Sequence, residues 1–273
     1  MSNTNLAFIG GGNMATSLTG GLIQTGFAPS AITISDPLAE NRQRLASKYG
    51  VNTTTDNHQA ITDASVVILA VKPQILKQVA LELAPALIHH PLVISIAAGI
   101  PVSALQEWLG DKIPIVRCMP NTPALLRQGA TGLFANDLVD EKQKQVAEDI
   151  LRAVGLAQWV DKEAAIDAVT AVSGSGPAYY FLVMEIMEKV GVELGLEAET
   201  ARQLTLQTAL GAARMALDSD VDTAELRRRV TSPAGTTERA IQSLQNSKLE
   251  DIFRQAMKDC VARAEEMAKE MTR

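Results

Sequence analysis

The stretch that decides the fold is Leu6-Ala7-Phe8-Ile9-Gly10-Gly11-Gly12-Asn13-Met14-Ala15. An apolar run leads directly into a glycine turn with the pattern G-x-G-x-x-A, and a helical segment continues from it through Leu22. Glycines suit such a turn because a β-carbon would block both the tight bend and the approach of a pyrophosphate to the N–H groups at the start of the helix. A strand, a tight turn and a helix in this order predict dinucleotide binding rather than a plain glycine-rich turn.

Further runs of β-branched and aliphatic residues follow the first strand. These runs are Ile32–Ser35, Val66–Val71, Leu92–Ile96 and Ile113–Arg117. They show little polar alternation, which is typical of strands buried on both faces of a parallel sheet, and helical segments between them supply the crossovers. We therefore predict an α/β fold in which an N-terminal Rossmann-type doubly wound sheet, residues 1–160, is the dinucleotide-binding domain.

The pattern changes at residue 161. The long segments Ala178–Gly195, Glu197–Leu217 and Leu249–Thr272 are rich in Ala, Leu, Met and Glu and contain no strand-like run. They predict a C-terminal all-α domain over residues 161–273. Residues 204–215 are too apolar for a helix with one wet face, so we predict that this domain forms a homodimer. Burial of the same helix within its own chain is the alternative.

Composition and charge limit the classes of function. The formal net charge is −6 and the pI is near 5.2, which argues against a broad electrostatic contact with nucleic acid or a membrane surface. The two cysteines, Cys118 and Cys260, do not have a metal-ligand spacing, and we predict no metal. Residues 1–6 lack the features of a signal peptide, and no apolar run is long enough to span a bilayer. We therefore expect a cytoplasmic protein that acts on a small molecule.

The loop after the second predicted strand bears on the choice of cofactor. Asp36 lies about twenty residues beyond the glycine turn, where an acid usually accepts hydrogen bonds from the adenosine ribose and favours NAD(H). Arg42 and Arg44 follow, and either guanidinium can bind the 2′-phosphate of NADP(H). A purely local role, in which Asp36 and Pro37 cap the next helix, is equally open. The sequence thus predicts NADP(H) or NAD(H) as cofactor.

The loops after the third and fourth predicted strands complete the expected cofactor site. Because these strands are parallel, residues 70–74 and 96–99 should lie at the same edge of the sheet as the glycine turn. Lys72 is a possible proton donor, although a solvated loop charge is the preferred interpretation. The predicted cofactor-binding residues are Gly10, Gly11, Gly12, Asn13, Met14, Ser35, Asp36, Asn57, Ala70, Val71, Lys72, Pro73, Ala97 and Ala98.

Two later segments precede helices and carry hydroxyl groups. Residues 232–238 predict a helix start with a hydroxyl near the cap, a proline in the first turn and a glutamate soon after, where free N–H groups can hold a carboxylate. An ordinary capped helix is the alternative. Residues 173–177 precede a helix that we expect to start near Ala178, and their glycines and hydroxyls permit a close polar contact with a substrate. An interdomain hinge is the competing interpretation.

Several separate blocks of the sequence match those of one enzyme family. The blocks are Phe8–Ala15, Ala70–Gln74, Arg117–Pro123, Ala171–Ala178 and Thr231–Thr237. Along nearly its whole length the chain resembles the pyrroline-5-carboxylate reductases. The family pattern usually has a glycine where Ala234 stands here, so the extra methyl group could narrow that loop.

The resemblance implies an NAD(P)H-dependent oxidoreductase that converts 1-pyrroline-5-carboxylate to L-proline, the last step of proline biosynthesis. It also implies that the helical half interleaves with that of a partner, that the active site lies near the dimer interface, and that higher homo-oligomers form. By resemblance, Ser232–Thr237 holds the substrate carboxylate. Our own candidates for catalytic residues are Thr237 and Ser175, whose hydroxyl groups can hydrogen-bond the substrate. The implied substrate-binding residues are Asn121, Thr122, Ser173, Gly174, Ser232, Gly235, Thr236 and Thr237.

Hydride transfer to C5 of a protonated imine needs no strong protein acid, and a hydroxyl of Ser175 or Thr237, or water, can hydrogen-bond the ring nitrogen. We predict that His58, His89 and His90 are surface residues.

A β-hydroxyacid dehydrogenase would need a lysine on the helix from Ala178, and residues 178–188 contain none. A keto-acid reductoisomerase would need clustered acidic metal ligands in the helical half. Glu185 and Glu188 are weak evidence for such a site, because paired acids on a helix are usually solvated. A non-catalytic nucleotide sensor would bind the cofactor without turnover.

Overall fold

The computed structural model describes residues 4–272, and the chain forms two compact units. The first unit runs up to Ser175 and also includes the chain from Cys260 onward, whereas the second is Gly176–Asp259. The boundary that we expected after residue 160 follows the end of the last strand, at Trp159, but the first unit continues through the next helical segment. The predicted boundary therefore marks the change in secondary structure rather than the limit of the compact unit.

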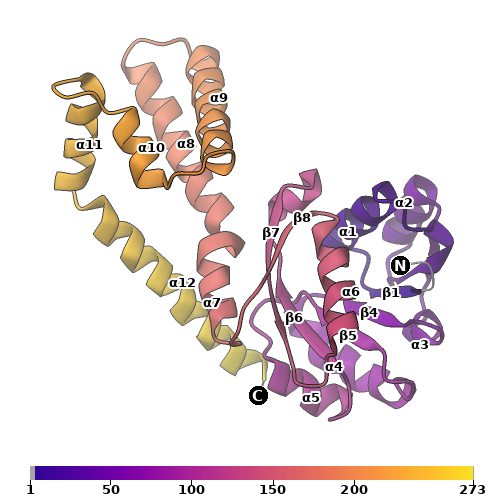
Figure 1. Cartoon of the computed structure of the whole chain (residues 1–273). Coiled ribbons are helices and arrows are strands. Elements are labelled where there is room, and N and C mark those ends of the chain that lie inside the picture. Colours follow the sequence, from indigo (N-terminus) through magenta and orange to yellow (C-terminus); the bar gives the residue numbers. More distant parts are fainter. Residues whose placement is uncertain (1–3, 273) are drawn as a thin grey trace. The chain divides into compact units, whose positions relative to one another are not determined.

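The first unit is built on one sheet of eight strands (Figure 1). The strands are β1 Leu6–Ile9, β2 Ile32–Ser35, β3 Asn52–Thr54, β4 Val66–Leu69, β5 Leu92–Ser95, β6 Ile115–Met119, β7 Gly129–Ala135 and β8 Gly155–Trp159. The helices between and after them are α1 Asn13–Gln24, α2 Ala39–Tyr49, α3 Asn57–Ile61, α4 Pro73–Leu83, α5 Val102–Leu109, α6 Glu141–Arg152 and α7 Ala165–Val169. Four shorter turns are η1 Pro29–Ala31, η2 Ala84–Ala86, η3 Thr122–Leu126 and the π-helical η4 Thr170–Gly174.

The strand order is β3-β2-β1-β4-β5-β6-β7-β8, and β1 to β6 are parallel. From β1 the chain first builds outward through β2 and β3, and then returns to the other side of β1 with β4. This reversal is the topological switch point of a doubly wound sheet, where ligands bind beyond the carboxyl ends of the strands. The predicted Rossmann-type architecture is confirmed.

Alternate residues of each strand point into two separate cores. Leu6 and Phe8 of β1 face the core covered by α1, α2 and α6, whereas Ala7 and Ile9 face the core covered by α3, α4 and α5. All four side chains are at most 1% exposed. Burial on both faces is why these strands read as continuous apolar runs.

Three strands were not predicted. β3 has the polar sequence Asn-Thr-Thr, β7 contains two glycines, and β8 lies at an edge of the sheet with exposed residues. β7 is antiparallel to β6, because the short connection through η3 is too brief for a crossover. The helix α6 then provides a crossover, so β8 is parallel to β7.

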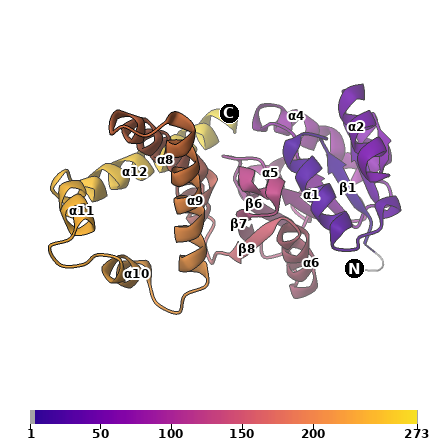
Figure 2. The ribbon, with the colours of Figure 1, turned by 90° about the horizontal axis from the view of Figure 1, so that it is seen from above.

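The second unit contains the helices α8 Gly176–Glu193, α9 Ala198–Leu217, α10 Thr223–Arg229, α11 Thr236–Asn246 and the first part of α12 Leu249–Met271. The predicted helical segments agree with α8, α9 and α12, and the described chain has no strand after Trp159. Helices α8 and α9 lie side by side in both views (Figures 1 and 2). None of the helices in the described part of the chain combines the length and hydropathy that a membrane span needs.

This unit buries little apolar surface within one chain. Buried residues of α9 are Ala201 and Thr205, and α10 and α11 have none. On α9, Leu204 is 55% exposed, Leu210 64% and Met215 58%. Burial of this helix within its own chain, the alternative considered from the sequence, is therefore wrong. Its apolar surface is available to another molecule.

A buried ion cluster joins the sheet to α7. Arg117 of β6 has a side chain only 6% exposed, and its guanidinium contacts Glu163 Oε1 at 2.9 Å and Asp167 Oδ1 at 3.3 Å. Glu163 Oε1 also accepts a hydrogen bond of 2.7 Å from the backbone N–H of Val102, the first residue of α5. One cation thus connects β6 with α7 and, through Glu163, with α5.

Replacing Arg117 by Ala should lower the free energy of unfolding by about 3 kcal/mol, because two partly buried carboxylates lose the guanidinium that they share. Urea denaturation of the variant and of Arg152→Ala measures the difference. Arg152 pairs with Glu148 but is 58% exposed, so its loss should cost at most about 1 kcal/mol. Equal losses in the two variants would contradict a special role for the buried cluster.

Candidate dinucleotide and substrate site

The glycine turn joins the loops that follow β1 and β4. Gly10 has a positive φ of 103°, and a β-carbon there would lie 2.7 Å from the carbonyl oxygen of Ala70. Neither the conformation nor the space suits another residue. The first predicted glycine is therefore required by the contact between the two loops at the topological switch point.

Gly12 has a different role. It is the N-cap of α1, and a β-carbon at this position would meet no atom within 4 Å. Folding of the chain does not require a glycine here. The first N–H groups of α1 have no acceptor within the helix, so an open space in front of them fits a pyrophosphate. The residues present therefore fit a dinucleotide.

Asp36 is turned inward and holds the glycine turn. The residue is 6% exposed, and its Oδ2 accepts hydrogen bonds from Gly11 N at 2.7 Å and from Asn41 Nδ2 at 3.1 Å. Its Oδ1 accepts from Leu38 N at 2.8 Å. These bonds occupy most of the acceptor capacity of the carboxylate. The local role considered from the sequence accounts for them, and a ribose contact stays a prediction.

The two arginines of α2 contact different loops. Arg42 Nη1 donates to the carbonyl oxygens of Asp36 at 2.7 Å and Pro37 at 2.9 Å, on the loop after β2. Arg44 Nη2 donates to the carbonyl oxygen of Gly11 at 3.0 Å, on the glycine turn. A guanidinium has five N–H donors, so both groups keep donors for a phosphate.

The remaining predicted cofactor residues follow the carboxyl ends of β2 to β5. Ser35 ends β2 with a buried hydroxyl that has no hydrogen-bond partner in the described chain, and Asn57 starts α3, where its Nδ2 lies 3.4 Å from Glu82 Oε1. Lys72 is exposed just before Pro73 starts α4, which agrees with a solvated loop charge. Val71 precedes it, and Ala97 and Ala98 follow β5. In a parallel sheet these positions share one edge.

The structure brings Asn121 and Ser173 together at the end of β6. Asn121 is 8% exposed; its Nδ2 donates to the carbonyl oxygen of Ser173 at 3.0 Å, and its Oδ1 accepts from Ala130 N at 2.9 Å. Thr122 next to it is exposed and starts η3. The amide of Asn121 thus ties the residues after β6 to the π-helical turn η4 that contains Ser173 and Gly174. Such turns are frequent at functional sites.

Ser175, a candidate catalytic residue, directly follows η4. Its Oγ lies 3.3 Å from Cys260 Sγ, a contact that the sequence did not predict because the residues are far apart in the chain. The other cysteine, Cys118, is fully buried in β6, and this burial raises the pKa of its thiol well above the ordinary value. Cys118 therefore stays protonated and is not a nucleophile.

The predicted carboxylate-binding segment lies in the second unit and begins with a turn. Gly235 N donates to the carbonyl oxygen of Ser232 at 3.0 Å, with Pro233 and Ala234 between them and Ala234 at a φ of 61°. Pro at the second position and a positive φ at the third are the features of a type II turn. The expectation that Pro233 lies in the first helical turn is wrong: α11 starts at Thr236 with Gly235 as its N-cap, because the proline is used by the preceding turn.

The candidate residues of this segment lie at the surface of the second unit. Ser232, Thr236 and Thr237 are exposed, and Gly235 is half-buried. Thr237 is the second residue of α11, close to N–H groups that lack intrahelical acceptors. Glu238, which was not among the candidate residues, accepts a hydrogen bond from Ala234 N at 2.8 Å. The pattern of a glutamate early in a helix is the signal that points to it.

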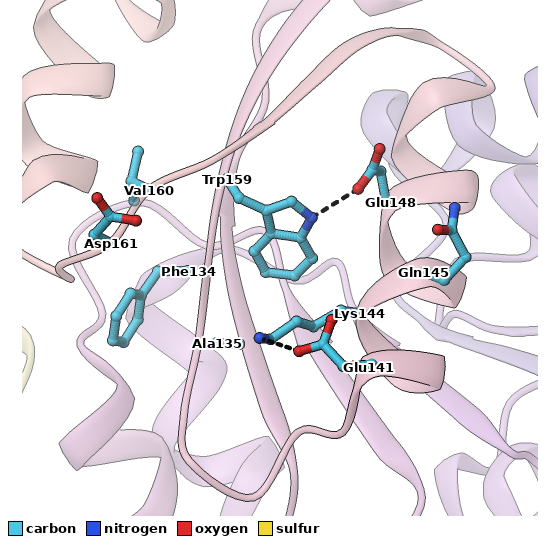
Figure 3. Close-up of a pocket in the computed structure, with 9 residues that line it drawn as sticks. All are labelled: Phe134, Ala135, Glu141, Lys144, Gln145, Glu148, Trp159, Val160 and Asp161. Carbon is cyan, nitrogen blue, oxygen red and sulfur yellow. Dashed lines mark hydrogen bonds and ion pairs between the residues drawn. The ribbon is translucent and has the colours of Figure 1, made fainter.

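A surface pocket elsewhere in the first unit does not involve these residues. It lies between α6, β7 and β8 and includes Trp159 (Figure 3). Trp159 Nε1 donates to Glu148 Oε2 at 2.8 Å, and Lys144 Nζ lies 2.7 Å from Glu141 Oε1. Each of these four polar side chains thus has a hydrogen-bond or ion-pair partner among the residues that line the pocket. The three histidines, His58, His89 and His90, are exposed as predicted.

A doubly wound sheet with a glycine turn at its switch point, followed by a helical unit with exposed apolar faces, defines a Rossmann-type dinucleotide-binding protein. The family model described as "NADP oxidoreductase coenzyme F420-dependent" matches residues 5–99. The model described as "Pyrroline-5-carboxylate reductase dimerisation" matches residues 163–267, so the chain carries a dimerisation domain.

Full-length relatives agree with these matches. The chain is 55% identical to the pyrroline-5-carboxylate reductase of Pseudomonas aeruginosa over 99% of both chains. The solved pyrroline-5-carboxylate reductase of Coxiella burnetii is 48% identical, with a TM-score of 0.94 over 97% of this chain and 99% of the other. The Plasmodium falciparum pyrroline carboxylate reductase, solved with NADP bound, is 29% identical, with a TM-score of 0.87 over 98% and 99%. The chain belongs to the pyrroline-5-carboxylate reductase family, whose members are NAD(P)H-dependent oxidoreductases.

Replacing Gly12 by Ala should weaken NADPH binding by at least about tenfold, or ~1.4 kcal/mol, because the new methyl group occupies the space in front of the α1 N-terminus. Its thermal stability should stay at the wild-type value. The matched variant Gly10→Ala should instead lose stability, since its β-carbon meets the Ala70 carbonyl. Protein-to-nicotinamide fluorescence transfer and thermal melting measure the two effects. Tight NADPH binding by Gly12→Ala would exclude this position from the pyrophosphate site.

Proposed function

We propose that the protein reduces 1-pyrroline-5-carboxylate to L-proline with NAD(P)H, which is the last step of proline biosynthesis. The main support within the structure is the convergence in the first unit of the glycine turn, the Ala97–Ala98 loop, Asn121 and Ser173 at one edge of the sheet. A small substrate held there would lie beside the reactive end of a dinucleotide. Membership of the family supplies the identity of the substrate class.

When bound, the reduced nicotinamide supplies the hydride that adds to C5 of the cyclic imine, while the ring nitrogen holds the proton of the protonated imine. The residues of this chain bind and orient the substrate. Ser232, Gly235, Thr236 and Thr237 hold its carboxylate at the start of α11, where the helix dipole favours an anion. Ser175 or Thr237 hydrogen-bonds the ring nitrogen. Orientation then supplies much of the rate.

We propose that the two arginines of α2 have separate roles in cofactor binding and that NADP(H) is preferred. The Arg42 side chain contacts the loop after β2, where the adenosine ribose of a dinucleotide binds, so it is the candidate for the 2′-phosphate. The Arg44 side chain contacts the glycine turn, so it acts on the pyrophosphate that both cofactors share. Because the Asp36 carboxylate is bonded within the chain, it does not need to contact the ribose.

We also propose that two chains pair through the dimerisation domain, that such dimers assemble into higher homo-oligomers, and that the enzyme works in the cytoplasm. The exposed apolar residues of α8 and α9 support the pairing, since contiguous apolar surface of this kind marks a protein interface. Tyr180 and Phe181 of α8 are 69% and 63% exposed in the single chain, and Leu210 of α9 is 64% exposed.

The proposed reaction can be separated from its rivals in one assay. NADPH and NADH oxidation should be fast with pyrroline-5-carboxylate and slow with pyrroline-2-carboxylate or the keto form of a 3-hydroxyacid. Thr237→Ala should raise the KM for the imine by about tenfold and lower kcat, because a hydroxyl bond to the carboxylate is lost. Thr237→Ser, which keeps the hydroxyl, is the control. Wild-type kinetics in Thr237→Ala would exclude this carboxylate site, and cofactor binding without any turnover would favour a sensor.

The roles of the two arginines predict different kinetic signatures. Arg42→Ala should raise the KM for NADPH by about tenfold and leave that for NADH unchanged, because only NADPH has the 2′-phosphate. Arg44→Ala should raise the KM for NADPH and the KM for NADH, because both cofactors have the pyrophosphate. The ratio of kcat/KM for the two cofactors is the measurement. If Arg42→Ala weakened both cofactors equally, the assignment of the 2′-phosphate to Arg42 would be wrong.

Replacing Leu210 by Glu should convert the dimer to monomers, because a charge would be buried between the two copies of α9. Sedimentation velocity measures the mass. Ile88→Glu is the control, since Ile88 is 83% exposed on the first unit and should not affect pairing. An unchanged mass for Leu210→Glu would mean that α9 does not form the interface.

A further inference from the structure

The turn before α11 contains an unfavourable residue. Ala234 occupies the third position of the Ser232–Gly235 turn at a φ of 61°, in the left-handed region. A type II turn needs a positive φ at this position and usually takes glycine there, because a β-carbon clashes with the adjacent backbone. A turn with alanine in this place needs a compensating interaction.

Glu238 supplies that interaction. Its Oε2 accepts a hydrogen bond of 2.8 Å from the backbone N–H of Ala234. Glu238 is the third residue of α11, the position from which a glutamate side chain folds back over the start of its helix. A carboxylate is a strong acceptor, and its charge is favourable in the first turn of a helix. The hydrogen bond therefore holds Ala234, the residue of this turn that has the unfavourable positive φ.

The bond acts on the same segment that is proposed to hold the substrate. Ala234 lies between Pro233 and the N-cap Gly235, so a change in its backbone would move the N–H groups of Thr236 and Thr237. The Glu238 carboxylate accepts its hydrogen bond from within this turn, at the Ala234 N–H.

We propose that Glu238 is a positioning residue for the carboxylate-binding segment: it holds Ala234 in the left-handed conformation and so keeps the N–H and hydroxyl groups of Thr236 and Thr237 directed at the substrate carboxylate. This inference rests on the proposed function of Ser232–Thr237. Glu238 itself does not touch the substrate. In a chain with glycine at position 234, the backbone would adopt the turn without this help.

The test is a double-mutant cycle. Glu238→Ala should raise the KM for pyrroline-5-carboxylate about tenfold, as expected for the loss of one charge-assisted hydrogen bond, and leave the KM for NADPH unchanged. Glu238→Gln keeps an acceptor of the same reach and should stay within about threefold of wild type. Ala234→Gly combined with Glu238→Ala should recover most of the lost affinity, because glycine adopts the positive φ unaided. A general structural defect would not be rescued in this way.

The outcomes separate this inference from the proposed function. If the wild type does not reduce the imine, the proposed function fails, and if Thr237→Ala keeps the wild-type KM, the proposed carboxylate site fails. If both of those results are as expected, the inference about Glu238 is overturned when Glu238→Ala keeps the wild-type KM, or when the double variant is no better than Glu238→Ala. Recovery in the double variant, with Glu238→Gln near wild type, supports it. Thermal melting of each variant confirms that the chain is folded.

Discussion

The close approach of the backbone at Gly10 to the carbonyl oxygen of Ala70 is the constraint on which the nucleotide-binding half depends. It brings the loops after two adjacent strands into contact at the point where the sheet reverses its direction of growth. A side chain between them would push the loops apart. Because these loops start α1 and α4, the same contact sets where the N-terminus of α1 lies, and therefore where a pyrophosphate can bind.

Buried polar side chains then fix the remaining loops along this edge. Asp36 bonds to the glycine turn and to the loop after β2, Asn121 joins the residues after β6 to Ser173, and Arg117 connects β6 with α7. Each of these groups is less than a tenth exposed. The edge is thus held by internal bonds before any ligand arrives, which reduces the ordering that binding requires.

Sequence reasoning identified the parts of the fold that carry strong local signals. β1, β2 and β4 to β6 were predicted because burial on both faces makes them continuous apolar runs, whereas β3, β7 and β8 are polar, rich in glycine or at an edge. The glycine turn was predicted from its pattern. The inward direction of Asp36, the Arg117 cluster and the contact of Ser175 with Cys260 depend on residues distant in the chain, which a single sequence does not bring together.

The two units of the chain differ in how their apolar side chains are buried. The sheet buries its apolar side chains in two cores within one chain. A substitution in these cores therefore changes the stability of the single chain, independently of protein concentration. The helical unit leaves the apolar residues of α8 and α9 exposed in the single chain, and the match to a dimerisation domain indicates cover by a second chain. The stability of the helical unit therefore depends on protein concentration through mass action. A substitution that weakens pairing is least visible at high protein concentration and becomes apparent on dilution.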